Sequence, residues 1–323
     1  VASIAAALAI WAFAGIRASL ALMPIVLFLR MALNAIDGML AREHGQKSRL
    51  GAILNETGDV VSDAALYLAL VPALAPYGAD PAQRLDVYRP AQSKGAPILL
   101  MVHGGGWANG DKAATRVVDN KVAHWIPKGF ILVSANYRLV PAATPLEQAD
   151  DVAKALAYVQ AHAGEWGGDA RHVVLIGHSA GAHLVSLLAA APDIAAGQGA
   201  KEWLGTIALD SAGYDIVALM RAPHFPLYDK VFATDEALWR AASPTLRLAS
   251  KPAPMLLVCS SKRADSCPAA KGFAAKAHSL GGKVTVLPLP MSHGDINGLL
   301  GTDGAYTAAT DKFLSSLGLG AGE

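Results

Sequence analysis

The chain has 323 residues, enough for one large domain of about 200 to 250 residues and a smaller unit. Its formal net charge is +1, and its 27 basic and 26 acidic side chains form no long run of like charge, which argues against a nucleic-acid partner. Hydrophobic residues make up 53% of the sequence and are concentrated in its first part. We therefore expect two domains, residues 1–79 and residues 80–323.

The first unit is expected to be an all-α apolar segment. Residues 1–40 could form two helices close to the lower length limit for crossing a bilayer, and residues 50–75 a third. The segment is too long for a signal peptide. If it inserts, the basic loop at 42–49 favours a cytoplasmic position for that loop and a periplasmic or extracytoplasmic one for the rest of the chain. The alternative is a buried helical hairpin in a soluble protein.

After the Pro and Gly residues of 72–81, short apolar runs alternate with longer helical ones. This pattern is typical of βα repeats, and predicts an α/β fold with a mostly parallel sheet flanked by helices. The expected strands lie at 85–88, 98–102, 130–134, 172–176, 204–209, 255–259 and 284–289, and the clearest helices at 146–162, 182–191, 268–280 and 306–317.

A glycine-rich turn follows one of the expected strands. Three glycines follow the expected strand at 98–102, in the sequence His-Gly-Gly-Gly-Trp. Because glycine has no Cβ, backbone amides here can approach a substrate closely, and the expected oxyanion donors are the amides of Gly105, Gly106 and Ala180. Trp107, at the end of the run, is expected to form a wall of the acyl pocket, although it could instead be a core aromatic.

The candidate nucleophile is Ser179. It stands at the centre of the pentapeptide Gly-His-Ser-Ala-Gly, between the strand at 172–176 and the helix at 182–191. Glycines at both ends of the pentapeptide permit a sharp turn that projects the hydroxyl, and the following helix directs amides at developing negative charge. The pentapeptide alone is common by chance in a glycine-rich chain, so the strand and helix around it carry the prediction.

The general base is expected late in the chain, and His293 fits best because it follows the last expected strand. His178 and His183, next to the nucleophile, are expected to be structural. For the acid we expect Asp265, in the loop after the strand at 255–259, where a carboxylate could hold the imidazole in the required tautomer.

Two other carboxylates are less suitable as the acid. Asp295 is only two residues from His293, and Asp210 ends a different strand. The loop that carries Asp265 lies between Cys259 and Cys267, the only cysteines of the chain. A disulfide bond could hold this loop in place, and two independent buried thiols are the alternative.

A short insertion at 211–254 is expected to form a small cap over the site. Its aromatic side chains favour small or medium acyl groups, or an aryl leaving group, over long triglycerides, unless they only fill the core. The expected substrate contacts from this insertion are Tyr214, Phe225 and Tyr228.

These motifs resemble the esterase and lipase branch of the α/β-hydrolase superfamily, which includes hormone-sensitive-lipase-like esterases and kynurenine-formamidase-like enzymes. The segments that carry the likeness are HGGGWANGDK at 103–112, SANYRL at 134–139 and GHSAGAHL at 177–184. The resemblance implies that Ser179 is acylated, that His293 acts as base and then as acid, and that no metal or organic cofactor is needed. The implied partner is a small-molecule ester.

The first unit resembles the CDP-alcohol phosphatidyltransferases, membrane enzymes that hold divalent metal between two helices. Asp37-Gly-Met-Leu-Ala-Arg, followed by Gly51 and Asp59, matches the spacing of their signature. However, Asn34 and Asn55 replace two aspartates, which weakens a site for a hard cation, so Asp37 and Asp59 are only degenerate metal candidates. The resemblance implies a partial transferase segment, or a membrane anchor.

Together, the residues predict a serine carboxylesterase acting through an acyl-enzyme intermediate. An arylformamidase or amidase could use the same triad. A different class of function, a CDP-alcohol phosphatidyltransferase with an accessory hydrolase domain, is the alternative implied by the first unit.

Overall fold

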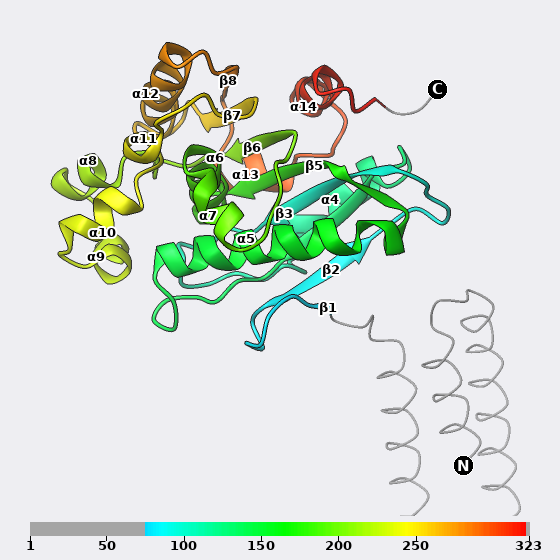
Figure 1. Cartoon of the computed structure of the whole chain (residues 1–323). Coiled ribbons are helices and arrows are strands. Elements are labelled where there is room, and N and C mark those ends of the chain that lie inside the picture. The colour runs from blue at the N-terminus through cyan, green and yellow to red at the C-terminus, as the bar shows by residue number, and fades with distance from the viewer. Residues whose placement is uncertain (1–74, 321–323) are drawn as a thin grey trace, which may run out of the picture. The chain divides into compact units, whose positions relative to one another are not determined.

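An eight-stranded sheet organises residues 75–320, the part of the chain that this computed structural model describes (Figure 1). The strand order is β1-β2-β4-β3-β5-β6-β7-β8. The pairs β1/β2 and β2/β4 are antiparallel, and all others are parallel, as the sequence predicts. The strands are β1 (Ala75–Pro76), β2 (Arg84–Tyr88), β3 (Ala96–Val102), β4 (Ile131–Ala135), β5 (Gly168–His178), β6 (Gly205–Leu209), β7 (Met255–Ser260) and β8 (Val284–Leu289).

The central strands are apolar on both faces because helices cover both. In β3, Ile98 and Leu100 pack into one hydrophobic cluster, whereas the alternate residues Leu99 and Met101 pack into a second. All four side chains are fully buried. Since successive side chains of a strand point to opposite faces, the two clusters are the two layers of core above and below the sheet.

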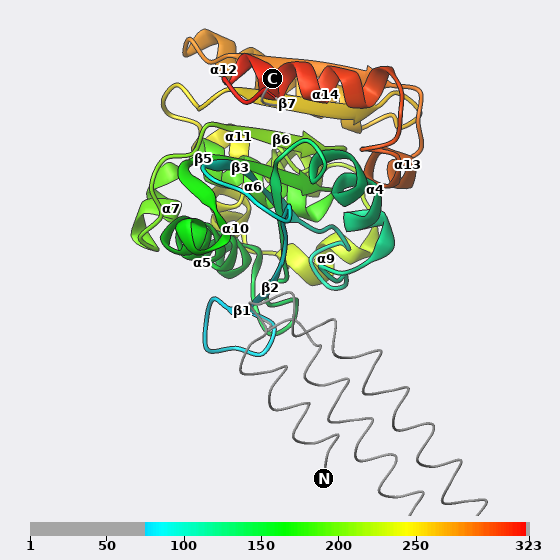
Figure 2. The same cartoon turned by 90° about the vertical axis from the view of Figure 1, so that its right-hand side faces the viewer.

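Five helices make these layers, and Figure 2 shows α5 and α4 on opposite sides of the central strands. The helices α5 and α6 contribute Leu156 and Leu184 to the first layer, together with Phe273 of α12. The helices α4 and α14 contribute Trp125 and Leu314 to the second. Their bounds are α4 (Thr115–Trp125), α5 (Pro145–His162), α6 (Ala180–Ala190), α12 (Ser266–Ser279) and α14 (Ala305–Ser316), with the shorter η1 (Ala163–Trp166), α7 (Pro192–Gly197) and α13 (His293–Gly298) between them.

The start of α5 shows how local sequence sets a helix boundary. The Thr144 side chain accepts a hydrogen bond from the Glu147 amide, and the Glu147 carboxylate accepts one from the Thr144 amide. Pro145 occupies the first helical position, where its missing N–H costs nothing. This reciprocal capping satisfies amides that a helix start otherwise leaves free.

The insertion between β6 and β7 forms the expected small cap. Its short helices gather with α12 at the left of Figure 1. The cap consists of α8 (Ile216–Arg221), α9 (Pro226–Phe232), α10 (Glu236–Ala241) and α11 (Pro244–Arg247).

The predicted strands and the four predicted helices are all present, with boundaries shifted by a few residues. Because β5 to β8 are parallel, the loops at their carboxyl ends meet at one edge of the sheet. That edge receives Ser179 after β5, Asp210 after β6, the 261–265 loop after β7 and His293 after β8.

The chain separates into two compact units, and Ala75–Glu323 is the second. The helices expected before residue 75, and the metal candidates Asp37 and Asp59, lie outside the described residues. Among residues 75–320, no helix has the length and apolar character needed to cross a bilayer.

Candidate active site

Ser179 stands on a sharp turn between β5 and α6. Its φ of +56° lies in the left-handed region, where a residue with a side chain is strained by about 1–3 kcal/mol. The turn is held because the Ser179 amide donates to the Leu209 carbonyl at 2.9 Å. A Cβ at Gly177 or Gly181 would lie 2.3 or 2.2 Å from a backbone oxygen, so both positions require glycine. The turn therefore presents the hydroxyl at the carboxyl edge of the sheet.

His293 lies against this hydroxyl, as predicted. Its Nε2 is 3.0 Å from the Ser179 Oγ. His178 supports it from behind, since its Nε2–H donates to the His293 carbonyl oxygen at 3.0 Å. Burial, followed by the nearness of His293, lowers the pKa of His178 to about 3, so this second imidazole stays neutral. His178 is thus a structural support for His293, which agrees with the structural role expected for it.

The carboxylate beside His293 belongs to Asp210, and the assignment of Asp265 to this place is corrected. Asp210 Oδ2 is 2.5 Å from the His293 Nδ1. Asp265 contacts Arg263 instead, at 2.9 Å, and its side chain is about half exposed. The loop after β7 is turned so that Arg263, and not Asp265, faces the imidazole, while the end of β6 delivers the buried Asp210 directly to it.

Asp210 is held by four donors. Oδ1 accepts from the Ser260 amide at 2.7 Å and from the Ser266 hydroxyl. Oδ2 accepts from His293 Nδ1–H and from Arg263 Nη1 at 3.0 Å. Burial of this side chain opposes its negative charge, but the bonds from His293, Ser266 and Ser260, with the Arg263 cation, outweigh burial and hold the pKa of Asp210 well below its usual range. The carboxylate is therefore charged and can fix the Nδ1–H tautomer of His293.

Asp210 also has a strained backbone, with φ at +52°. Among residues 75–320, the residues other than glycine with positive φ are Trp107, Ser179, Asp210 and Ala233, and the first three line one cleft. Backbone strain of this kind persists where surrounding contacts fix a functional geometry.

The loop after β7 is closed by a disulfide bond between Cys259 and Cys267. This resolves the choice that the sequence left open. The bridge encloses Ser260, Arg263 and Ser266, which supply three of the four donors to Asp210. It therefore restrains the loop that holds the acid in place.

The glycine loop after β3 lies opposite Ser179. Gly105 and Gly106 have φ of +121° and +61°, and a Cβ at Gly105 would lie 2.0 Å from the Asn109 carbonyl oxygen. Within the described residues, neither glycine amide donates to another backbone group. Ala180 is the first residue of α6, so its amide has no partner within the helix. Gly105 and Gly106 line the same cleft as Ser179, and Ala180 follows Ser179 directly in the chain.

Trp107, Phe225 and Tyr228 line the cleft above Ser179, which has a volume of about 480 Å³. Trp107 is almost fully buried, and its indole N–H donates to Nδ1 of His183 at 3.1 Å. Phe225 is 68% exposed at the rim. Tyr214 does not line this cleft; it is buried beneath the cap and faces a neighbouring cavity.

From the sequence, Asp210 was considered as the acid and set aside, and Ser260, Arg263 and Ser266 were not identified as functional. Asp210 carries a signal that could have identified it, because an aspartate directly after an apolar strand ends at the same sheet edge as the nucleophile. The other three are recognisable only from their contacts with Asp210.

Comparison with known protein families divides the chain at a similar place. Residues 85–206 match the BD-FAE family, and residues 1–79 match the CDP-alcohol phosphatidyltransferase family. The resemblance to an esterase-type α/β-hydrolase preceded by a phosphatidyltransferase-like segment is therefore confirmed.

Two curated relatives are similar to parts of this chain. One is the inner membrane protein YnbA of Escherichia coli, 81% identical over 47 residues, which are 15% of this chain and 23% of that protein. The other is the probable carboxylic ester hydrolase LipM of Mycobacterium tuberculosis, 37% identical over 115 residues, or 35% of this chain and 26% of that protein. The chain thus spans about a quarter of the length of each.

Solved structures agree on the fold. A thermophilic esterase from Thermogutta terrifontis superposes with a TM-score of 0.62 at 21% identity, over 74% of this chain and 89% of that one. At this identity the likeness shows the fold alone, and confirms the predicted α/β-hydrolase fold.

Proposed function

We propose that the protein is a serine hydrolase that cleaves carboxylic esters through an acyl-enzyme intermediate. The observation that carries the proposal is the continuous chain of contacts from Ser179 Oγ to His293 and from His293 to the buried Asp210. The relatives named as ester hydrolases support the choice of bond. Amide hydrolysis remains the alternative use of the same groups.

In the proposed reaction, His293 Nε2 removes the proton of Ser179 as its Oγ attacks the ester carbonyl carbon. The Asp210 carboxylate stabilises the imidazolium that results, through Nδ1–H. The negative oxygen of the tetrahedral intermediate is expected to accept hydrogen bonds from Gly105, Gly106 and Ala180. One such donor contributes about 10²–10³ to the rate of related reactions.

The second half of the reaction uses the same groups in reverse. His293 gives its proton to the leaving alcohol oxygen, which leaves Ser179 acylated. A water molecule then takes the place of the alcohol, loses a proton to His293 and attacks the acyl carbon. Return of that proton to Ser179 Oγ releases the carboxylic acid and restores the enzyme.

Hydrolysis of p-nitrophenyl acetate and butyrate tests the proposal. The wild-type chain should release p-nitrophenol, and Ser179→Ala should reduce the rate to background. Equal rates in both proteins would refute it. Hydrolysis of a matched p-nitroanilide at a comparable rate would favour the amidase alternative.

We further propose that residues 1–79 form a separate domain that attaches the hydrolase to a membrane. The family match over these residues and the membrane relative support this proposal. The full chain should sediment with membranes and resist extraction by alkaline carbonate. Recovery of the full chain in the soluble fraction would contradict it. CMP release that requires divalent metal and is lost in Asp37→Ala would support a transferase instead.

A further inference from the structure

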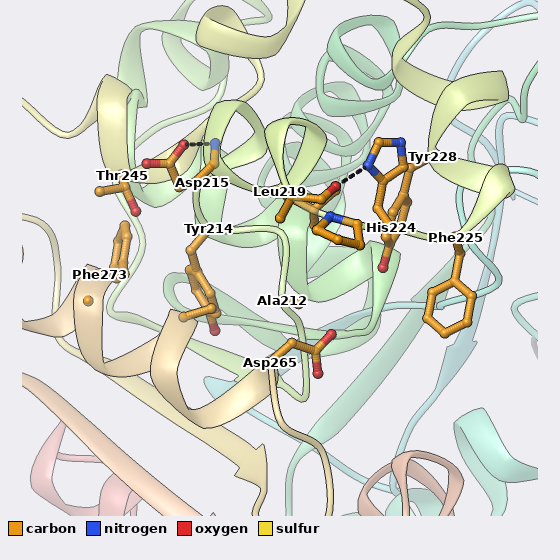
Figure 3. A pocket seen from close by; sticks show the side chains of 15 residues that line it. Ala212, Tyr214, Asp215, Leu219, His224, Phe225, Tyr228, Thr245, Asp265 and Phe273 are labelled. Atoms are coloured by element: carbon orange, nitrogen blue, oxygen red, sulfur yellow. Dashed lines mark hydrogen bonds between the residues drawn. The ribbon is translucent and has the colours of Figure 1, made fainter.

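A second cavity, of about 620 Å³, lies beneath the cap and is larger than the catalytic cleft. Its walls come from the cap helices α8 and α9 and from α12. In Figure 3, Tyr214 and Phe273 lie on one side of it and Tyr228 and Phe225 on the other, with Asp265 between them. None of the residues Ser179, Asp210 and His293 lines it.

The two cavities are neighbours. Ala212, Phe225 and Tyr228 line both of them. Ala212 follows Asp210 by two residues, so one end of the larger cavity lies close to the acid of the proposed triad. A molecule whose ester group lies at Ser179 could therefore extend past Ala212 into the second cavity.

The walls of this cavity are mainly apolar and are built from small or aromatic residues. Tyr214 and Phe273 are fully buried behind it and pack against each other with ring centroids 5.2 Å apart. On the α8 side the wall is formed by Ala218 and Leu219. Burial of an alkyl or aromatic group against such a surface is favourable because it removes apolar area from water.

Gly272 gives an independent reason to regard the cavity as a built feature. It lies in the middle of α12, where glycine stabilises a helix less than alanine does. A Cβ at Gly272 would meet nothing within 4 Å, and its φ is not in the left-handed region. Neither packing nor backbone geometry requires glycine there, but any larger side chain would occupy cavity space.

The charges in the wall are mostly negative. Asp215, Asp265 and His224 line the cavity; Asp265 is paired with Arg263 and His224 with Asp229, whereas Asp215 makes no ion pair within residues 75–320. An anionic group would therefore be repelled on entering, whereas a neutral one would not.

We propose that this cavity binds the neutral, apolar part of the ester substrate, an alkyl chain or aromatic ring too large for the catalytic cleft. Gly272 on α12 and Ala218 on α8 set its size. The proposal rests on the proposed esterase function and specifies its substrate class: esters with one extended, uncharged apolar group.

Hydrolysis of three esters by the full-length enzyme tests this proposal. Methyl acetate fits the cleft alone. Methyl heptanoate and hexyl acetate are isomers that place the long chain on the acyl or the alcohol side. Values of kcat/KM are measured by titration of the released acid, and each is divided by the value for methyl acetate to give a preference ratio.

The variant Gly272→Trp should lower the preference ratio of at least one isomer by tenfold or more, and leave methyl acetate within about twofold. Which isomer loses activity identifies the acyl or the alcohol chain as the occupant. Ala218→Trp, from the opposite helix, should lower the same ratio. The matched control is Gly197→Trp, since Gly197 ends α7, has equal open space around it and lies away from the cavity.

Preference ratios that are unchanged in both tryptophan variants would overturn the proposal, provided methyl acetate is still hydrolysed. Failure of the esterase proposal itself looks different, because the wild-type chain would then hydrolyse none of the three esters. Retained methyl acetate hydrolysis also shows that each variant is folded.

Discussion

Asp210, from the structure, and Asp265, from the sequence, are the two candidates for the acid of the triad. Replacing each of them by asparagine distinguishes these two assignments. Asp210→Asn removes the charge beside His293 and permits the wrong imidazole tautomer. Asp265→Asn is the matched control, with the same change of chemistry in the neighbouring loop. Only Asp210 contacts the imidazole, at 2.5 Å.

The expected magnitudes differ greatly. The Asp210 side chain is fully buried, so a carboxylate and an imidazolium with charge centres about 4 Å apart attract by about 4 kcal/mol at an effective dielectric constant of 20. Loss of this attraction corresponds to a fall in kcat of about 10³. Asp265 is half exposed and paired only with Arg263, a type of contact that contributes about 0–1 kcal/mol, so its variant should stay within about fivefold of wild type.

Initial rates of p-nitrophenyl acetate hydrolysis give kcat for both variants. Urea unfolding midpoints confirm folding, because an asparagine oxygen can still accept from Ser260 and Ser266. A loss of about 10³ in Asp265→Asn, with Asp210→Asn close to wild type, would refute the assignment made from the geometry.

Three further predictions concern stability. Burial lowers the pKa of Lys121 from 10.5 to about 7, so between these pH values the unfolded chain binds a proton that the folded chain has released, and the free energy of unfolding should rise with pH by up to ~1.4 kcal/mol per unit. Urea titrations at pH 7, 8 and 9 should show this rise for the wild-type chain and not for Lys121→Met. The same dependence of unfolding free energy on pH in both proteins would contradict the prediction. Replacing Cys259 and Cys267 by serine should lower the free energy of unfolding by about 2–3 kcal/mol through loss of the loop constraint, and a double variant as stable as wild type would count against that constraint. Ala233 has φ +48° and ψ −149°, a region that only glycine adopts readily, so Ala233→Gly should raise the unfolding free energy by about 1 kcal/mol, and a lower melting temperature would show that the strain argument fails.

The positions of Ser179 and His293 could be predicted because each depends on local sequence. The strand before Ser179 is apolar, glycines flank the turn and a helix follows, and His293 lies just after the last strand. The strands were equally predictable, since runs such as 255–259 are buried on both faces and carry no polar interruption.

The acid could not be predicted in the same way. Asp210 and Asp265 both follow strands of the same parallel sheet, and Asp265 was expected to be the acid because of its place in the loop after the strand at 255–259. The choice depends on which side chain the loop after β7 turns toward His293, and there Arg263 occupies the place expected for Asp265. Such a choice is made by tertiary contacts between separate loops.

Two other features differ from the sequence-based expectations. The helix α4 (Thr115–Trp125) is not among the helices predicted from the sequence. Its buried face is not continuously apolar, because Lys121 donates to the Asn297 carbonyl oxygen instead of packing as a hydrophobic residue. Tyr214 was expected in the cleft with the other cap aromatics, but it faces the cavity beside the cleft. Sequence placed it in the cap without fixing the direction of its side chain.

The central claim is that Ser179 is the nucleophile. It is tested most directly by labelling the full-length chain with a fluorophosphonate and locating the adduct by peptide mass spectrometry. We predict a single adduct on Ser179, with loss of esterase activity in proportion to labelling, and no adduct in Ser179→Ala. Full esterase activity in a chain whose Ser179 is completely labelled would contradict the claim.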